Sequence, residues 1–321
     1  MKRRIAAALL SALLVCACLG LPSAAQEAGS SEDTPVKFHF LDVNSLNKGD
    51  GPIGSADCIV IEDHGKITMV DAGTPYDVSV QKIFDYLDGL GVTKIEHLFL
   101  SHPHDDHGGG MPAVIEKYDI GTVYCKASDW DTLRDIEIEW RTREIYDDVL
   151  LAAQRKQNSD GSTVKIVHPE TDGETVTVSA DSSFEIWNCE APWENKHYHP
   201  EFNDYSMVMK YTYKDVSALL MGDINRTYES SLLGHVGKCD IFKAAHHGTK
   251  GSVSSSALFD EINASVAVVT GLRANFNVGG AATDKVITEV LESRGISYKI
   301  TEDGDVVVTT DGRTVSIAQT A

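Results

Sequence analysis

A run of metal-binding residue types directly follows a short apolar strand, and it constrains the fold more than any other feature. The stretch 97–100 is largely apolar, and the sequence SHPHDDHGGG begins after it at Ser101. Three histidines and two aspartates lie within residues 102–107. Imidazole and carboxylate groups suit zinc, manganese or iron, and the glycines that follow allow a close backbone turn. We therefore expect a metal-binding loop at the end of a buried strand.

The spacing of this run suits two adjacent metals. We expect His102 and His104 to bind one metal, and Asp106 and His107 to bind the other. The alternative is a polar surface loop or an adventitious nickel-binding cluster. Matching residues farther along the chain disfavour that alternative.

Two later segments also end apolar strands with ligand-type residues. We expect Asp223 to bridge both metals, although an aspartate there could be a helix N-cap or turn residue. His246 and His247 follow a second apolar stretch, and one of them would ligate the second metal while the other faces the substrate. Asp71 could support a ligand histidine from behind or could simply form a turn before Gly73.

In this order, Asp71, the 102–107 motif, Asp223 and His247 resemble the metallo-β-lactamase superfamily. The chain is most similar to its ComEC-like hydrolase subgroup and also resembles the teichoic-acid phosphorylcholine esterase. The matching stretches, within about residues 36–315, are 40–43, 222–224, 246–249 with Ser252, and 302–312. The resemblance implies an α/β fold, a four-layer αββα sandwich with metals at one edge. It assigns His247 to the metal and His246 to the leaving group or phosphate of the substrate.

The sequence departs from the superfamily at the usual third histidine. Residues 202–206 stand there instead. His197 and His199 just upstream could fill the gap, but they are better interpreted as surface histidines. The loop 44–55 is also longer than in ComEC-like domains, which leaves the substrate open. Aromatic residues near the third motif could form a cage for a quaternary ammonium group or could pack as ordinary core: Trp187, Trp193, Tyr198, Phe202 and Tyr205.

These features favour a binuclear phosphodiesterase with two divalent metals, zinc or manganese. Such metals lower the pKa of a bridging water toward neutrality, and Asp106 and Asp223 would orient the resulting hydroxide. The expected partner is a phosphodiester-type small molecule or cell-envelope polymer. A net charge of −20 disfavours nucleic acid. A lactam or lactone hydrolase, and a non-catalytic binding lipoprotein of the same fold, are the alternatives.

The N-terminus indicates export. Residues 1–25 have a basic start, an apolar stretch and a small-residue cleavage site, which is typical of a signal peptide. Residues 14–17 before Cys18 resemble a lipobox, so we expect a secreted or lipid-anchored protein with a linker at 26–35 and a hydrolase domain at 36–321. Region 132–155 is expected to be helical and could cover the site as a lid. The pairing of Cys58, Cys125, Cys189 and Cys239 is open.

Overall fold

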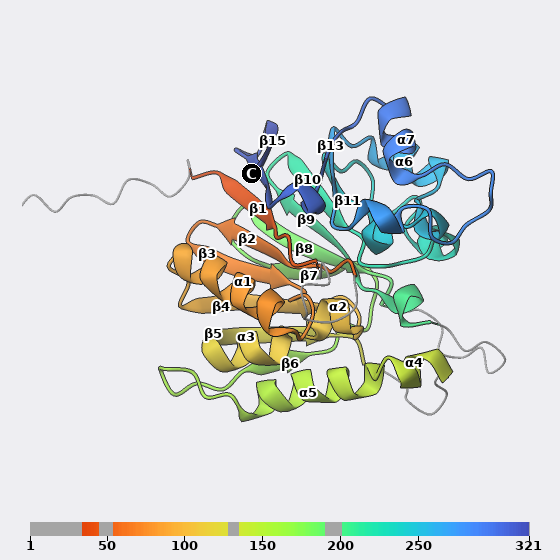
Figure 1. Cartoon of the computed structure of the whole chain (residues 1–321). Helices are drawn as coiled ribbons and strands as arrows, with labels where there is room; N and C mark the ends of the chain where they lie inside the picture. The colour runs from red at the N-terminus through yellow and green to blue at the C-terminus, as the bar shows by residue number, and fades with distance from the viewer. Residues whose placement is uncertain (1–33, 45–53, 128–134, 190–200, 321) are drawn as a thin grey trace, which may run out of the picture. The chain divides into compact units, whose positions relative to one another are not determined.

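The strands of the chain form two mixed sheets (Figure 1). The computed structural model describes residues 34–44, 54–127, 135–189 and 201–320. The first sheet has the order β15-β14-β1-β2-β3-β4-β5-β6. Its strands are β1 (Val36–Phe40), β2 (Ile59–Asp63), β3 (Lys66–Val70), β4 (Lys94–Leu100), β5 (Asp119–Cys125), β6 (Lys165–Val167), β14 (Val306–Thr310) and β15 (Val315–Gln319).

The second sheet has the order β13-β12-β11-β10-β9-β8-β7. Its strands are β7 (Glu174–Thr177), β8 (Ser182–Trp187), β9 (Val208–Tyr213), β10 (Val216–Leu220), β11 (Ile241–Lys243), β12 (Val266–Val269) and β13 (Ser297–Ile300). Phe38 of the first sheet packs edge to face against Tyr211 of the second, within an apolar core shared by both sheets. The two sheets are therefore packed face to face.

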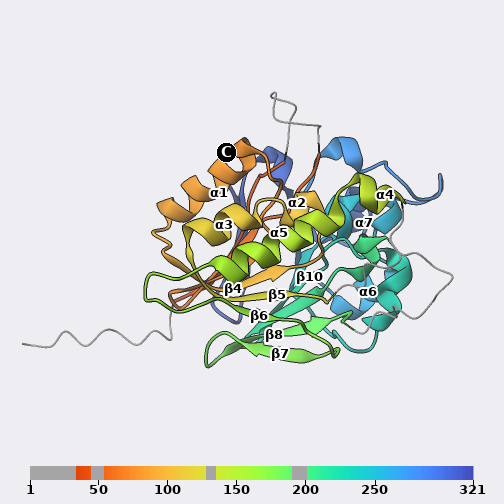
Figure 2. The same cartoon turned by 90° about the horizontal axis from the view of Figure 1, so that it is seen from below.

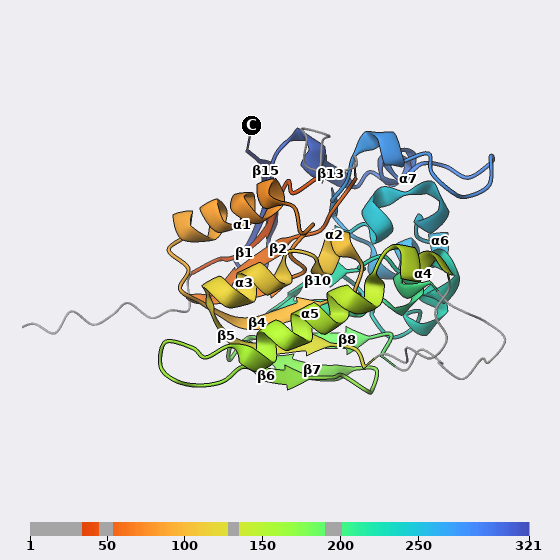
Figure 3. The same ribbon diagram turned by 60° about the horizontal axis from the view of Figure 1, so that its bottom comes forward.

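Helices cover the outer face of each sheet. Figures 2 and 3 show α1 (Asp77–Gly89), α3 (Met111–Lys117) and α5 (Thr142–Arg155) side by side over the first sheet. The helices α6 (Ser256–Ile262) and α7 (Ile287–Ser293) pack against the second sheet through a separate apolar cluster. This arrangement confirms the expected four-layer αββα sandwich. No helix within the described ranges is long and apolar enough to cross a membrane.

The region expected to form a lid is two helices with different neighbours. The short α4 (Asp135–Glu139) ends before Arg141, whose φ of 58° breaks the helix, and α5 follows. Tyr146, Val149 and Ala153 of α5 are buried in the apolar cluster under the first helix layer. The lid prediction is therefore wrong for α5, because its apolar face packs onto the sheet. The short α4 reaches the candidate site through Glu137, whose carboxylate lies 2.9 Å from His104 Nε2.

Several strands end at the same edge of the sandwich. The strands β3, β4 and β5 are parallel neighbours in the first sheet, and β10, β11 and β12 are parallel neighbours in the second. Ligands of open α/β sheets bind outside the carboxyl ends of such strands. The chain places its titratable loops after β3, β4, β10 and β11, so this edge carries the candidate site.

Candidate metal centre

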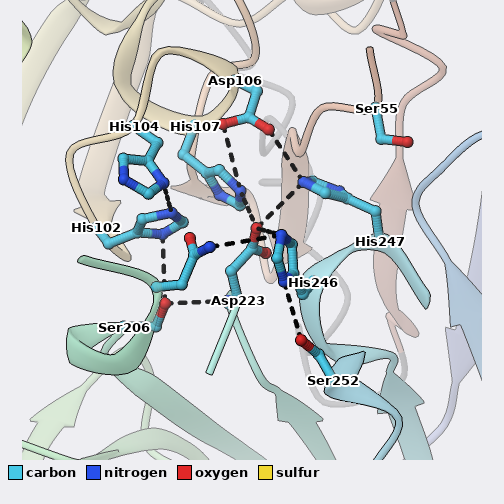
Figure 4. Close-up of polar contacts among 12 residues, drawn as sticks. Ser55, His102, His104, Asp106, His107, Ser206, Asp223, His246, His247 and Ser252 are labelled. Carbon is cyan, nitrogen blue, oxygen red and sulfur yellow. Dashed lines mark hydrogen bonds and ion pairs between the residues drawn. The ribbon is translucent and has the colours of Figure 1, made fainter. Parts of the chain in front are cut away.

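Four side chains converge at this edge of the sandwich (Figure 4): Asp106, His107, Asp223 and His247. The Nε2 atoms of His107 and His247 each lie 3.2 Å from Asp223 Oδ2. Asp106 Oδ2 lies 3.2 Å from the same His247 nitrogen. His107 follows β4 on the short α2 (Asp105–Gly108), Asp223 follows β10, and His247 follows β11. The structure thus brings together all the residues predicted for the second metal.

The residues predicted for the first metal lie beside this group. His102 Nε2 is 3.0 Å from His104 Nδ1, and the rings of His102 and His107 have centroids 4.1 Å apart. Ser206 Oγ, from the third-motif stretch, lies 3.3 Å from His102 Nδ1 and accepts a hydrogen bond from the Asp223 backbone N–H at 3.0 Å. A serine therefore occupies this side of the site, as the sequence predicted, and Asp223 lies between the two groups.

Hydrogen bonds determine which ring nitrogens can bind a metal. His247 Nδ1 donates to the Thr270 carbonyl at 2.8 Å, and His107 Nδ1 donates to Asp71 Oδ2 at 2.8 Å. Both imidazoles therefore present Nε2 to Asp223. Asp71 is also held by the backbone N–H and the hydroxyl of Ser101 at 2.7 and 2.6 Å. Asp71 is therefore placed to hold the His107 ring through Nδ1. Of the two roles considered for Asp71, this geometry fits the supporting role better than a plain turn.

The nitrogen and oxygen atoms that converge here fit the ligand set of divalent metals. His107 Nε2 and Asp223 Oδ1 are buried and have no hydrogen-bond partner among the described residues. His104 Nε2 faces the carboxylate of Glu137 at 2.9 Å, so its Nδ1 presents a lone pair toward His102 Nε2. A bound cation would satisfy such converging lone pairs, and neutral imidazole with carboxylate is the donor set of zinc or manganese sites. Ligation by these residues stays a prediction.

The Asp223 carboxylate and the imidazoles beside it stabilise each other's charged forms. Burial would raise the pKa of Asp223, but the imidazoles of His107 and His247 outweigh it and hold that pKa well below its usual value. Burial would lower the pKa of each of these imidazoles, and Asp223 outweighs it, so both pKa values lie well above the ordinary value. Without a metal, protons on the two rings balance the carboxylates.

A buried ion pair that the sequence analysis did not predict lies behind His247. Lys243 of β11 contacts Asp57 Oδ2 and lies 3.7 Å from Asp223 Oδ1. Asp57 Oδ1 lies 3.2 Å from His247 Nδ1, and together with His107, Asp223 and His247 it offers ligand atoms within 4.8 Å of one another. Asp57 nevertheless approaches the imidazoles of His107 and His247 from the Nδ1 side. We therefore assign Asp57 an orienting role and keep Asp106 as the expected ligand. A lysine within the apolar stretch 241–245 was the signal available in the sequence.

His246 lies beside this group on a polar chain of its own. Its Nδ1 is 2.9 Å from Ser252 Oγ, whose hydroxyl donates to Asn225 Oδ1 at 2.7 Å. The Nδ1–H therefore points to Ser252, and Nε2 lies 3.8 Å from Asp223 Oδ2 and 3.4 Å from Asn203 Nδ2. The side chain is 28% exposed, whereas that of His247 is 4% exposed. His246 is thus placed to meet a substrate.

The backbone around the site is strained. Asp71, His246 and His247 have φ values of 59°, 46° and 53°, which non-glycine residues rarely adopt. Gly222 has a φ of 52°, and a Cβ there would lie 2.8 Å from Ser206 Cβ. Each strained residue costs on the order of 1–3 kcal/mol and persists where surrounding structure enforces it, commonly at functional sites.

A pocket of about 320 Å³ opens beside the second group of ligands. Most of its described lining residues carry polar side chains, and none of them is lysine or arginine: Gly54, Ser55, Thr74, Tyr76, Asp105, Asp106, His246, His247, Thr249, Asn275 and Val278. Of the aromatic residues that could form a quaternary ammonium cage, the three that the structure describes, Trp187, Phe202 and Tyr205, are not part of this lining. Phe202 and Tyr205 are 3% and 6% exposed, and Trp187 packs against His235, so these three rings are packing residues. Trp193, Tyr198, His197 and His199 lie outside the described residues, as does most of the loop 44–55.

Comparison with known proteins agrees with this geometry. A family model for the metallo-beta-lactamase superfamily matches residues 51–261. The chain belongs to this superfamily. A crystal structure of a superfamily-fold protein, YhfI from Bacillus subtilis, covers 89% of this chain and 100% of its own, with a TM-score of 0.51 and 12% identity. That likeness supports the fold.

Curated superfamily relatives match only part of their own length. Recombination protein 2 of Haemophilus influenzae is 24% identical over 229 residues, which is 70% of this chain and 24% of that protein. Endoribonuclease ysh1 of Schizosaccharomyces pombe is 29% identical over 149 residues, which is 42% of this chain and 19% of that protein. The chain thus spans about a quarter or less of these relatives. The first match agrees with the ComEC-like resemblance.

Proposed function

We propose that this chain is an exported phosphodiesterase that uses two divalent metals, most favourably zinc, with manganese as the alternative. The observation that carries the proposal is the convergence of four imidazoles and the Asp106 carboxylate around Asp223, with two ring nitrogens on each side of it. When bound, the metals would activate a water as nucleophile and neutralise phosphate charge. His102, His104, Asp106, His107, Asp223 and His247 would hold them.

The remaining residues have separate tasks in this proposal. Asp106 and Asp223 would orient the nucleophile, because a carboxylate oxygen of each lies 3.2 Å from His247 Nε2. His246 would take up the proton that the attacking water releases and pass it to the leaving-group oxygen through Nε2, because its Nδ1 is held by Ser252. Burial lowers the pKa of His246, so the neutral ring is ready to accept a proton near neutrality.

Two observations support a phosphodiester over a lactam. The third-motif stretch offers Asn203 and Ser206 instead of a histidine. One relative is an endoribonuclease by name, and such an enzyme cleaves phosphodiesters. The net charge of −20 and the absence of lysine and arginine from the described pocket lining favour a small phosphodiester or an envelope polymer over a long nucleic acid.

A substrate panel tests the proposal. Protein reconstituted with zinc or manganese should hydrolyse bis-p-nitrophenyl phosphate or p-nitrophenyl phosphorylcholine, and should leave nitrocefin intact. The His104→Ala variant should lose this activity, because it removes a predicted ligand. Cleavage of nitrocefin alone would favour the lactamase alternative. Protein that binds no metal under these conditions and cleaves none of the three substrates would favour the non-catalytic alternative.

Export is part of the proposal and rests on residues 1–25, which lie outside the described structure. Mass spectrometry of the mature N-terminus tests it in a bacterial host with a secretion pathway. A start at Gln26 indicates secretion, and a lipid-modified Cys18 indicates anchoring to the membrane. An intact Met1 on cytoplasmic protein contradicts both.

A further inference from the structure

We infer that Glu137 is a positioning residue for the first metal, and that it holds His104 in the ring orientation that ligation requires. The inference rests on the metal site of the proposed function and deepens it. Glu137 lies on α4, in a region that the sequence predicted to be helical and to be a candidate lid, with no residue of it assigned to the metals. Its position beside His104 is therefore visible only in the tertiary structure.

Glu137 is a buried carboxylate with a complete set of partners. The residue is 0% exposed. Its Oε2 accepts hydrogen bonds from His104 Nε2 at 2.9 Å and from Thr142 Oγ1 at 2.7 Å, and its Oε1 accepts from the Phe202 backbone N–H at 2.8 Å. A buried carboxylate is costly unless it is hydrogen-bonded in this way. Glu137 is thus part of a buried network of hydrogen bonds.

The contact with His104 determines which nitrogen faces the metal. An ionised carboxylate can only accept, so the proton of neutral His104 lies on Nε2. The lone pair of Nδ1 then points toward His102 Nε2, 3.0 Å away. A carboxylate behind a ligand histidine fixes the tautomer and raises the basicity of the ring. His107 has the same arrangement with Asp71, so each of the two groups of ligands contains one carboxylate-backed imidazole.

Glu137 also connects His104 to the stretch where the third histidine is missing. Its bond to the Phe202 N–H holds the start of the short helix Phe202–Tyr205, which carries the buried Asn203. A first metal with fewer imidazole ligands depends more strongly on the orientation and basicity of those that remain. Glu137 therefore strengthens the site at the point where the chain departs from its superfamily.

The test measures zinc affinity without substrate. Glu137→Gln keeps the size of the side chain and removes its charge, and Glu137→Ala removes the contact. Glu139→Gln, an exposed position on the same helix, is the matched control. Zinc competition against a chromophoric chelator and metal analysis would resolve two sites per chain, and thermal melting of the metal-free protein reports folding.

We expect Glu137→Gln to weaken the first zinc by about 10- to 100-fold, while the second zinc and the control are unchanged. Wild-type affinity at both sites in Glu137→Gln and Glu137→Ala would overturn the inference. An equal loss at both sites together with a collapse of metal-free melting would show a merely structural role and would also overturn it. Selective loss of one zinc from a protein that cleaves no phosphodiester would sustain the inference and refute the proposed function.

Discussion

Lys243 and Asp57 form an ion pair beneath the candidate metal centre, and their side chains are 0% and 1% exposed. The ammonium group also donates to the Gly222 carbonyl at 3.0 Å, next to Asp223. Burial would lower the pKa of Lys243, but Asp57 and Asp223 outweigh it and raise that pKa. The lysine is therefore a fixed cation beneath the carboxylates and imidazoles of the site.

Removing this cation should destabilise the protein. Lys243→Met leaves Asp57 as a buried charge without its main partner, which costs about 3–5 kcal/mol. Urea denaturation of the metal-free protein measures the change in the free energy of unfolding. Lys238→Met, at a side chain that is 61% exposed, is the control and should change it by less than about 1 kcal/mol. A Lys243→Met protein as stable as this control would contradict the assignment.

His246→Asn should separate catalysis from metal binding. The variant removes the ring that faces the substrate and leaves the predicted ligands in place, so we expect kcat to fall by about 10²- to 10⁴-fold. Zinc content should stay at the wild-type value, and His235→Asn, an exposed histidine beside Trp187, should retain full activity. If His246→Asn lost zinc in proportion to activity, His246 would be a ligand instead.

Zinc affinity should rise with pH. In the metal-free protein the carboxylates raise the pKa values of His107 and His247, so both rings hold protons at neutral pH. Zinc must displace these protons, and each one displaced changes the affinity by about tenfold per pH unit below the raised pKa. Calorimetry in buffers of different ionisation enthalpy should show proton release on binding. Affinity that is constant from pH 6 to 8 would contradict this charge balance.

Local sequence patterns predicted most of the candidate site, and the resemblance to the superfamily implied the sandwich. The 102–107 run, Asp223 and His247 each follow an apolar strand, so strand order alone brings them to one edge. Their chemistry is visible in short segments because ligand types and spacing are local properties. The family match agrees with this interpretation.

The supporting residues could not be predicted in the same way. Glu137 lies 33 positions from His104, and Asp57 lies far from Lys243 in the sequence. The neighbouring sequence does not distinguish Glu137 from Glu139 on the same helix. The two residues differ because α4 directs Glu137 into the interior and Glu139 toward solvent.

Anomalous diffraction from zinc-loaded crystals tests the central claim most directly, because it locates the metals independently of any substrate. The account predicts two zinc peaks at this edge of the sandwich. One should lie against His102 Nε2 and His104 Nδ1, and the other against His107 Nε2 and His247 Nε2, with Asp223 touching both. A single peak, or zinc bound by other residues, would contradict a binuclear centre.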